Sequence, residues 1–189
     1  NVDASTIETQ SISSTISGEM RTNAVKAVII SCIFMLLYIW FRFKDIRFAS
    51  SAILALVHDV LVVVTAYALI RISVGSTFIA CILTIVGYSV NDTIVIFDRI
   101  REFFGLYPKR NRMQLFNDSL NTTLARTINT SLSTLIVLLC IFVLGGDSIR
   151  SFAFAMILGV VIGTLSSIFI AAPIAYLTMG NKMPEETKA

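Results

Sequence analysis

Two acidic side chains and one histidine interrupt segments that are otherwise apolar. Asp92 follows Asn91 within VGYSVNDTIVIF, and Asp59 follows His58 within ALVHDVLVVV. A charged group in hydrocarbon is costly unless it has a partner or a proton, so acids in such segments commonly mark ion or proton pathways. These residues could therefore bind and release protons, provided that the segments lie in a membrane.

Arg126 opens a later apolar segment and supplies a positive charge at a similar depth. At about 1.5 Å per helical residue, Asp92 lies roughly 9 Å and Asp59 roughly 12 to 13 Å from the ends of their segments. Burial favours a protonated acid, whereas a nearby arginine favours the charged carboxylate, so movement of Asp92 between the two environments would bind and release a proton. The other interpretation is a structural salt bridge between Asp92 and Arg126.

Hydroxyl groups follow Arg126 along its segment, with Thr130 and Ser133 at positions i+4 and i+7. On a helix these residues share one face, which predicts a polar path through the interior. For each hydroxyl taken singly we favour the alternative that it bonds a carbonyl of its own helix. Two interpretations also remain for the pair His58 and Asp59. It is either a second titrating element or a hydrogen-bonded pair that braces the bundle.

The composition places these residues in a membrane protein. The chain has 189 residues, of which 56% are hydrophobic and 14% charged, whereas soluble domains carry roughly 25% charged residues. Apolar runs long enough to cross a bilayer lie at about 24–42, 52–72, 77–97, 127–145 and 152–178. Their hydrophobicity is continuous rather than alternating, which predicts helices instead of barrel strands. We therefore expect an all-α polytopic membrane protein with five transmembrane helices.

Charge in the connections predicts the orientation and the domain boundaries. Lys and Arg gather after the first, third and fifth runs, whereas the alternate connections hold only Arg71 and Arg150, so the C-terminus is expected in the cytoplasm. We expect residues 1–22 to end an extracytoplasmic domain with a strand, residues 23–180 to form the transmembrane domain and residues 181–189 a cytoplasmic tail. After a break at Pro108, residues 109–124 predict an amphipathic helix at the cytoplasmic interface. Because the chain starts at Asn1, we also expect upstream sequence.

Several classes of function find no support in the sequence. GxxxxGK[ST], HExxH and GxSxG motifs do not occur, and the one histidine and three separated cysteines lack metal-ligand spacing. We therefore predict no enzyme activity, no cofactor and no metal. The basic residues border apolar runs instead of forming one stripe, which argues against a nucleic-acid partner. A GxxxG pattern at Gly159 and Gly163 favours packing within the chain over dimerisation.

Longer stretches resemble a known family. VGYSVNDTIVIFDRIRE at 86–102, ALVHDV at 55–60 and SLNTTLARTINTSLSTL at 119–135 resemble the SecF family of protein-export membrane subunits, and the similarity extends from residue 1 to about 180. The resemblance implies a fold of the resistance-nodulation-division type, with this chain supplying spans two to six of six. It also implies a multi-pass protein of a bacterial or archaeal cytoplasmic membrane.

The resemblance further implies a function and partners. Together with SecD, separate or fused, members of the family use the proton-motive force to promote late stages of preprotein translocation through SecYEG, and YajC and YidC are further associates. Asp92 and Arg126 would be the proton-coupling pair. Asn91, His58, Asp59, Thr130 and Ser133 would be supporting polar residues, with no firm role for the His58 and Asp59 pair.

Two other functions stay open at this point. Fold alone does not decide the substrate, so a proton-coupled exporter of small molecules or lipids is one alternative. A non-catalytic membrane scaffold is the other, with Arg126 and Asp92 only locking the helices together. Normal protein secretion in a deletion strain would favour the first, and tolerance of an apolar replacement for the pair would favour the second.

Overall fold

The computed structural model describes residues 14–71 and 76–179, and within them every regular element is a helix. In chain order these are α1 (Ser14–Phe43), α2 (Ile46–Ile70), α3 (Ser76–Leu106), α4 (Arg112–Leu144), α5 (Asp147–Ser166), the π-helix η2 (Ser167–Ala171) and α6 (Ala172–Met179). With α5, η2 and α6 as one continuous span, five helices are long and apolar enough to cross a membrane. The prediction of an all-α polytopic membrane protein is confirmed.

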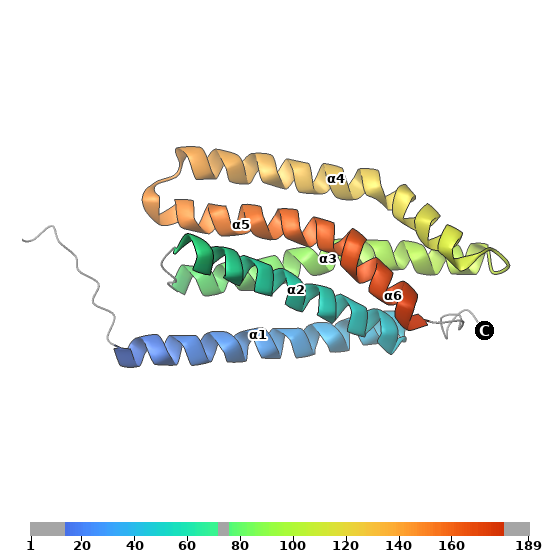
Figure 1. Cartoon of the computed structure of the whole chain (residues 1–189), viewed down its shortest axis with the longest axis horizontal. Coiled ribbons are helices and arrows are strands. Elements are labelled where there is room, and N and C mark those ends of the chain that lie inside the picture. The colour runs from blue at the N-terminus through green and yellow to red at the C-terminus, as the bar shows by residue number, and fades with distance from the viewer. Residues whose placement is uncertain (1–13, 72–75, 180–189) are drawn as a thin grey trace, which may run out of the picture.

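The helices form an elongated bundle around α3, which packs against α1, α2, α4 and α5 (Figure 1). In this view α1 and α4 lie at opposite edges, with α5 beside α4 and α2 in front of α3. The helices that contact α3 therefore bring residues far apart in the sequence to its surface. This central position explains why the polar residues of α3 meet partners from several helices.

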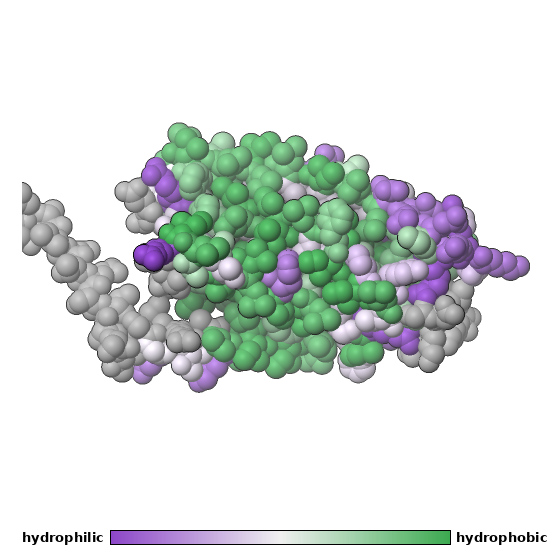
Figure 2. Space-filling model, viewed as in Figure 1, coloured by the Kyte–Doolittle hydropathy of each residue, from purple (hydrophilic) through white to green (hydrophobic). Residues whose placement is uncertain are grey.

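The two ends of the bundle differ in charge. The corner between α1 and α2, the turn between α3 and α4 and the end of α6 lie at one end (Figure 1). That end carries the basic groups near Arg42, Arg47, Arg99 and Arg110 and is hydrophilic, next to a broad apolar band (Figure 2). The alternation of basic connections along the sequence therefore corresponds to opposite ends of one bundle.

Local capping explains where the helices begin. Asp45 accepts a hydrogen bond from the Arg47 backbone N–H at 3.0 Å and caps α2. Asn111 accepts one from the Met113 backbone N–H at 3.1 Å and caps α4, three residues after Pro108 in the preceding turn. Such side-chain caps satisfy N–H groups that lack a partner at a helix start. Both caps lie at the basic end of the bundle.

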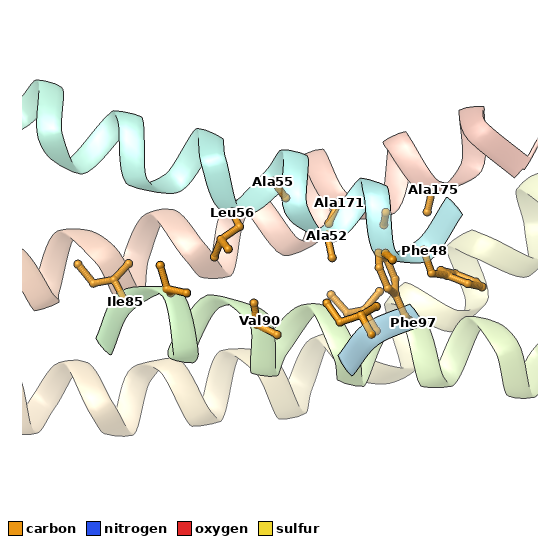
Figure 3. Close-up of a cluster of buried hydrophobic side chains, with 14 of the residues drawn as sticks. Phe48, Ala52, Ala55, Leu56, Ile85, Val90, Phe97, Ala171 and Ala175 are labelled. Atoms are coloured by element: carbon orange, nitrogen blue, oxygen red, sulfur yellow. The ribbon is translucent and has the colours of Figure 1, made fainter. Parts of the chain in front are cut away.

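The apolar core lies between α2, α3 and the span formed by α5, η2 and α6 (Figure 3). At one end Phe48 and Phe97 are buried with their ring centroids 4.9 Å apart. Farther along, the small residues Ala52, Ala55 and Ala171 are also buried. Small side chains let membrane helices approach closely, because packing replaces the hydrophobic effect in lipid.

The glycine pattern in α5 also serves this packing. A Cβ atom on residue 159 would lie 2.3 Å from Ile85, and one on residue 163 would lie 3.1 Å from the Cβ of Ser89, both on α3. The preference for packing within the chain over dimerisation is therefore confirmed. Contact with Ser89 also brings α5 beside the polar residues of α3.

A π-helical turn, η2, interrupts the last span. The Ala172 N–H bonds the Ser167 carbonyl, five residues back instead of four. The turn ends at Ala171, two residues before Pro173, which has no N–H to give to the Phe169 carbonyl in a regular α-helix. Single π-turns often occur where a helix adapts to such a residue or to a functional site.

Two expectations about local structure differ from the helices, whereas the domain boundaries themselves stay predictions. Residues 14–20 belong to α1 and are helical, whereas we expected the stretch at 1–20 to supply the last strand of an external domain; residues 1–13 and the expected tail at 181–189 lie outside the described part of the chain. The segment 109–124 is no separate amphipathic helix, because α4 runs without a break from Arg112 to Leu144. Its apolar residues Leu115 and Phe116 are buried in the bundle instead of facing the interface.

Candidate functional site

Asp92 lies in the middle of α3 and is only 3% exposed. Its hydrogen-bond partner is Thr164 of α5, whose Oγ1 lies 3.5 Å from Asp92 Oδ2. That distance is at the long limit for a hydrogen bond between oxygens. A buried carboxylate with so weak a partner is poorly compensated for its lost hydration, so a proton or another charge would stabilise it.

Thr164 joins Asp92 to a third helix. Its Oγ1 also lies 2.6 Å from Ser131 Oγ of α4 and donates to the Val160 carbonyl of α5 at 2.8 Å. The Thr164 hydroxyl has one proton, so it can donate to only one of these three oxygens at a time. Asp92, Thr164 and Ser131 therefore form a short polar chain across α3, α5 and α4 whose hydrogen bonds can rearrange.

Arg126 is exposed on the surface of this chain and makes no ion pair with Asp92 within the described residues. Its positive charge nevertheless acts electrostatically on Asp92. The direct salt bridge considered from the sequence is thus not formed in this arrangement of helices. Asp92 is instead buried beside Thr164 of α5, whereas Arg126 of α4 is exposed.

The polar stripe that begins at Arg126 lies outside the core, contrary to the predicted interior path. Ser133 is exposed and Thr130 is partly exposed. Thr130 Oγ1 donates to the Arg126 carbonyl at 2.9 Å and Ser133 Oγ to the Thr130 carbonyl at 2.8 Å. The preference for bonds to carbonyls of their own helix is confirmed for both hydroxyls.

The buried face of α4 carries a different polar stripe, with Ser119, Thr123, Thr127 and Ser131 at intervals of four residues. Sequence reasoning missed this stripe and Thr164. A signal was present, because Thr164 follows Gly163 in the small-residue face of α5. Either stripe of α4 satisfies helical spacing, and only packing against α5 selects the second.

Asp59 forms a second polar centre on α2, where it is fully buried. Ser89 Oγ of α3 donates to Asp59 Oδ2 at 2.5 Å, and His58 Nδ1 lies 3.1 Å from Asp59 Oδ1. Ser89 precedes Asp92 by three residues on α3. Asp59 therefore contacts α3 about one helical turn from Asp92. The remaining predicted residue, Asn91, is exposed and does not join either centre.

Comparison with known proteins identifies similar sequences. The family model described as "Protein export membrane protein SecD/SecF, C-terminal" matches residues 1–181. A protein of Cereibacter sphaeroides named protein translocase subunit SecF is 43% identical over 178 residues, which are 94% of this chain and 55% of that protein. The chain thus spans about half the length of this relative.

A fused relative and a solved structure show the same similarity. A Thermus thermophilus protein named protein translocase subunit SecDF is 40% identical over 183 residues, which are 97% of this chain and 25% of that protein. A crystal structure of SecDF in a super-membrane-facing form matches with a TM-score of 0.80 and 42% identity, over 94% of this chain and 24% of that one. The chain is therefore similar to these proteins in both sequence and fold.

Proposed function

The chain belongs to the SecD/SecF family of protein-export membrane proteins, and we propose that, with a SecD subunit, it uses the proton-motive force to promote late stages of preprotein translocation. The observation that carries this proposal is Asp92, an acid buried in the middle of a membrane span with one long hydrogen bond. Buried acids of this kind commonly belong to proton pathways. The part played is that of a transport subunit rather than an enzyme.

The proposed coupling depends on two environments for Asp92. Beside Thr164 the carboxyl group is enclosed by helices and a bound proton stabilises it. Beside Arg126 or water the carboxylate form is stabilised instead. Because each protonation state favours a different position of α3 relative to α4 and α5, proton binding and release would shift the bundle between two arrangements. One proton crossing 100 mV supplies about 2.3 kcal/mol for such a shift.

The polar face outside the core supports the proposed partner. Arg126, Asn129 and Ser133 on α4 are exposed within a membrane span, as is Asn91 on α3. The Tyr88 hydroxyl of α3 donates to Thr134 Oγ1 of α4 at 3.4 Å and joins the two helices beside this face. Charged and amide groups are costly against lipid, so we propose that the membrane part of SecD covers them. The relative named SecDF, in which the subunits are fused, favours this partner.

Further partners and the orientation follow the same proposal. SecYEG would supply the channel, a preprotein would be the substrate, and YajC and YidC would be associated subunits. The basic end of the bundle, with Arg42, Arg47 and Arg110, would face the cytoplasm together with the C-terminus of a bacterial or archaeal membrane protein.

Depletion of the full-length protein from its host tests the proposed substrate. We expect late translocation intermediates of secreted proteins to accumulate, with unchanged sensitivity to small toxic compounds. Complementation with the wild type should restore export, and Asp92→Asn at matched membrane levels should not. Normal secretion together with raised drug or lipid sensitivity would instead establish the exporter alternative.

The scaffold alternative needs a separate variant. Asp92→Leu combined with Arg126→Leu removes both charges, and a scaffold that does not use these charges for coupling should keep its function with apolar side chains in their place. We expect this double variant to assemble with its partner and yet to fail in export. Full export activity of the assembled double variant would favour the scaffold.

A further inference from the structure

Asp59 is better satisfied by hydrogen bonds than Asp92. It is fully buried, and each of its two carboxyl oxygens has a partner, Ser89 Oγ at 2.5 Å and His58 Nδ1 at 3.1 Å. Asp92 by contrast has one partner at 3.5 Å. The two hydrogen bonds of Asp59 thus fix the position of its carboxyl group between α2 and α3, whereas the single long bond of Asp92 restrains that side chain less.

His58 connects the buried acid to the surface. It lies near the midpoint of α2, and 44% of its side chain is exposed whereas that of Asp59 is fully covered. Figure 2 shows hydrophilic atoms over α2 within the apolar band. An imidazole at this depth is stable when water or a polar partner reaches it.

The neighbouring spans contribute no strongly basic or acidic group near this pair except Asp92. Residues 27–41 of α1 and 151–179 of the last span contain no Asp, Glu, Lys, Arg or His, and residues 77–97 of α3 contain only Asp92. The weak acids in these elements are cysteines and tyrosines, such as Cys81 and Tyr176, which are ordinarily neutral near pH 7. His58 is therefore the titratable side chain that directly contacts Asp59.

Ser89 links the protonation state of Asp59 to residues in the centre of the bundle. Its backbone carbonyl accepts a hydrogen bond from Thr93 Oγ1 at 3.2 Å, and Thr93 Oγ1 lies 3.0 Å from Ser167 Oγ of η2. Gly163 of α5 packs directly on Ser89. A change in the bond between Asp59 and Ser89 therefore acts on the same turns of α3 and α5 that hold Asp92 and Thr164.

We propose that His58 and Asp59 form a second proton-binding site, which controls how firmly α2 holds α3 beside Asp92. The inference rests on the proposed function and assigns a role to a pair outside the Asp92 centre. A neutral His58 next to the Asp59 carboxylate takes one proton from water, and the site becomes an imidazolium and a carboxylate. Transfer of the Nδ1 proton to Asp59 Oδ1 then leaves a neutral imidazole and a carboxylic acid.

The transfer weakens the contact between the helices. A serine hydroxyl bonds a carboxylate more strongly than a neutral carboxylic acid, because the charged acceptor strengthens the bond. With Asp59 protonated, Ser89 is held less firmly and α3 can shift relative to α2. Return of the proton to water through His58 restores the carboxylate and the firm contact.

The pH dependence of preprotein release separates this role from simple bracing. In the full-length protein with its partner, His58→Asn keeps a hydrogen-bond donor beside Asp59 but cannot titrate. We expect this variant to lose the dependence of the release rate on pH that the wild type shows. Thr65→Val is the control on α2, because Thr65 Oγ1 bonds only the Leu61 carbonyl and is exposed. A wild-type profile for His58→Asn would overturn the proposal.

Infrared difference spectroscopy after a pH jump provides the second test and does not depend on export. We expect a protonated-carboxyl band that Asp59→Asn removes and Asp92→Asn retains. Ser89→Ala keeps both acids and should shift this band, which also covers the case in which Asp59→Asn fails to assemble. Absence of any band that responds to Asp59→Asn or Ser89→Ala would refute the second site. Loss of export coupling is judged separately with Asp92→Asn, so the two proposals can fail independently.

Discussion

Gly159 of α5 packs directly onto Ile85 of α3, so that a Cβ atom on residue 159 would lie 2.3 Å from Ile85 Cγ1. Ile85 is only 1% exposed and belongs to the apolar core. This contact sets the distance between the two helices that carry Asp92 and Thr164. The polar chain between these residues therefore depends on a glycine that has no polar group of its own.

Gly159→Ala should destabilise the bundle by about 1 to 3 kcal/mol, the usual cost of adding a methyl group to a filled core. Unfolding in detergent with increasing denaturant would measure the change. The matched control is Gly87→Ala on α3, where an added Cβ meets nothing within 4 Å. Equal stability of both variants would show that α5 and α3 are not in close contact at Gly159.

Thr164→Val should weaken proton coupling without preventing assembly. Valine has nearly the shape of threonine but lacks the hydroxyl that bonds Asp92 and Ser131. Loss of one such bond costs on the order of 1 kcal/mol, so the expected effect on preprotein release is partial and appears mainly in its dependence on the proton-motive force.

The control for this change is Thr84→Val. Thr84 Oγ1 donates to the Ala80 carbonyl of its own helix at 2.8 Å, as Thr164 does to Val160, but among residues 14–71 and 76–179 it has no hydrogen-bond partner on another helix. Release by Thr84→Val should match the wild type. If both valine variants behave alike, the contact between Thr164 and Asp92 has no part in coupling.

Asp92→Asn and Arg126→Gln should be strongly non-additive in export rate. Although the two side chains form no ion pair in this arrangement, the proposed cycle uses both in one step, so either change alone should remove most of the coupling. A double-mutant cycle measures this interaction directly. Independent, multiplicative losses would mean that Arg126 acts on something other than Asp92, such as the partner subunit.

The spans and the burial of Asp92 were predictable from the sequence because they depend on local composition. Continuous apolar runs can satisfy their backbone only as helices in lipid, and an acid within such a run belongs in the interior. Helix ends were less predictable, because α3 and α4 continue beyond the apolar runs to Leu106 and back to Arg112. Those ends are fixed by the turn at Pro108 and by the Asn111 cap.

The orientation of α4 was not predictable, since the stripe from Arg126 to Ser133 and the stripe from Thr123 to Ser131 both carry hydroxyl groups at helical spacing. The choice depends on which stripe meets Thr164 of α5, a contact between residues 33 positions apart in the case of Ser131. The partners of Asp59 were hidden for the same reason. Hydroxyl groups are common in membrane helices, and spacing alone does not show which of them meet an acid.

The most direct test of the account is preprotein release from membrane vesicles that contain the full-length protein and its partner, measured with and without a protonophore. Wild-type release should be fast and should slow when the proton gradient is collapsed. Asp92→Asn, at matched levels and with the partner still bound, should release slowly under both conditions. If Asp92→Asn keeps the wild-type rate and the wild-type response to the protonophore, Asp92 is a structural residue and proton coupling lies elsewhere.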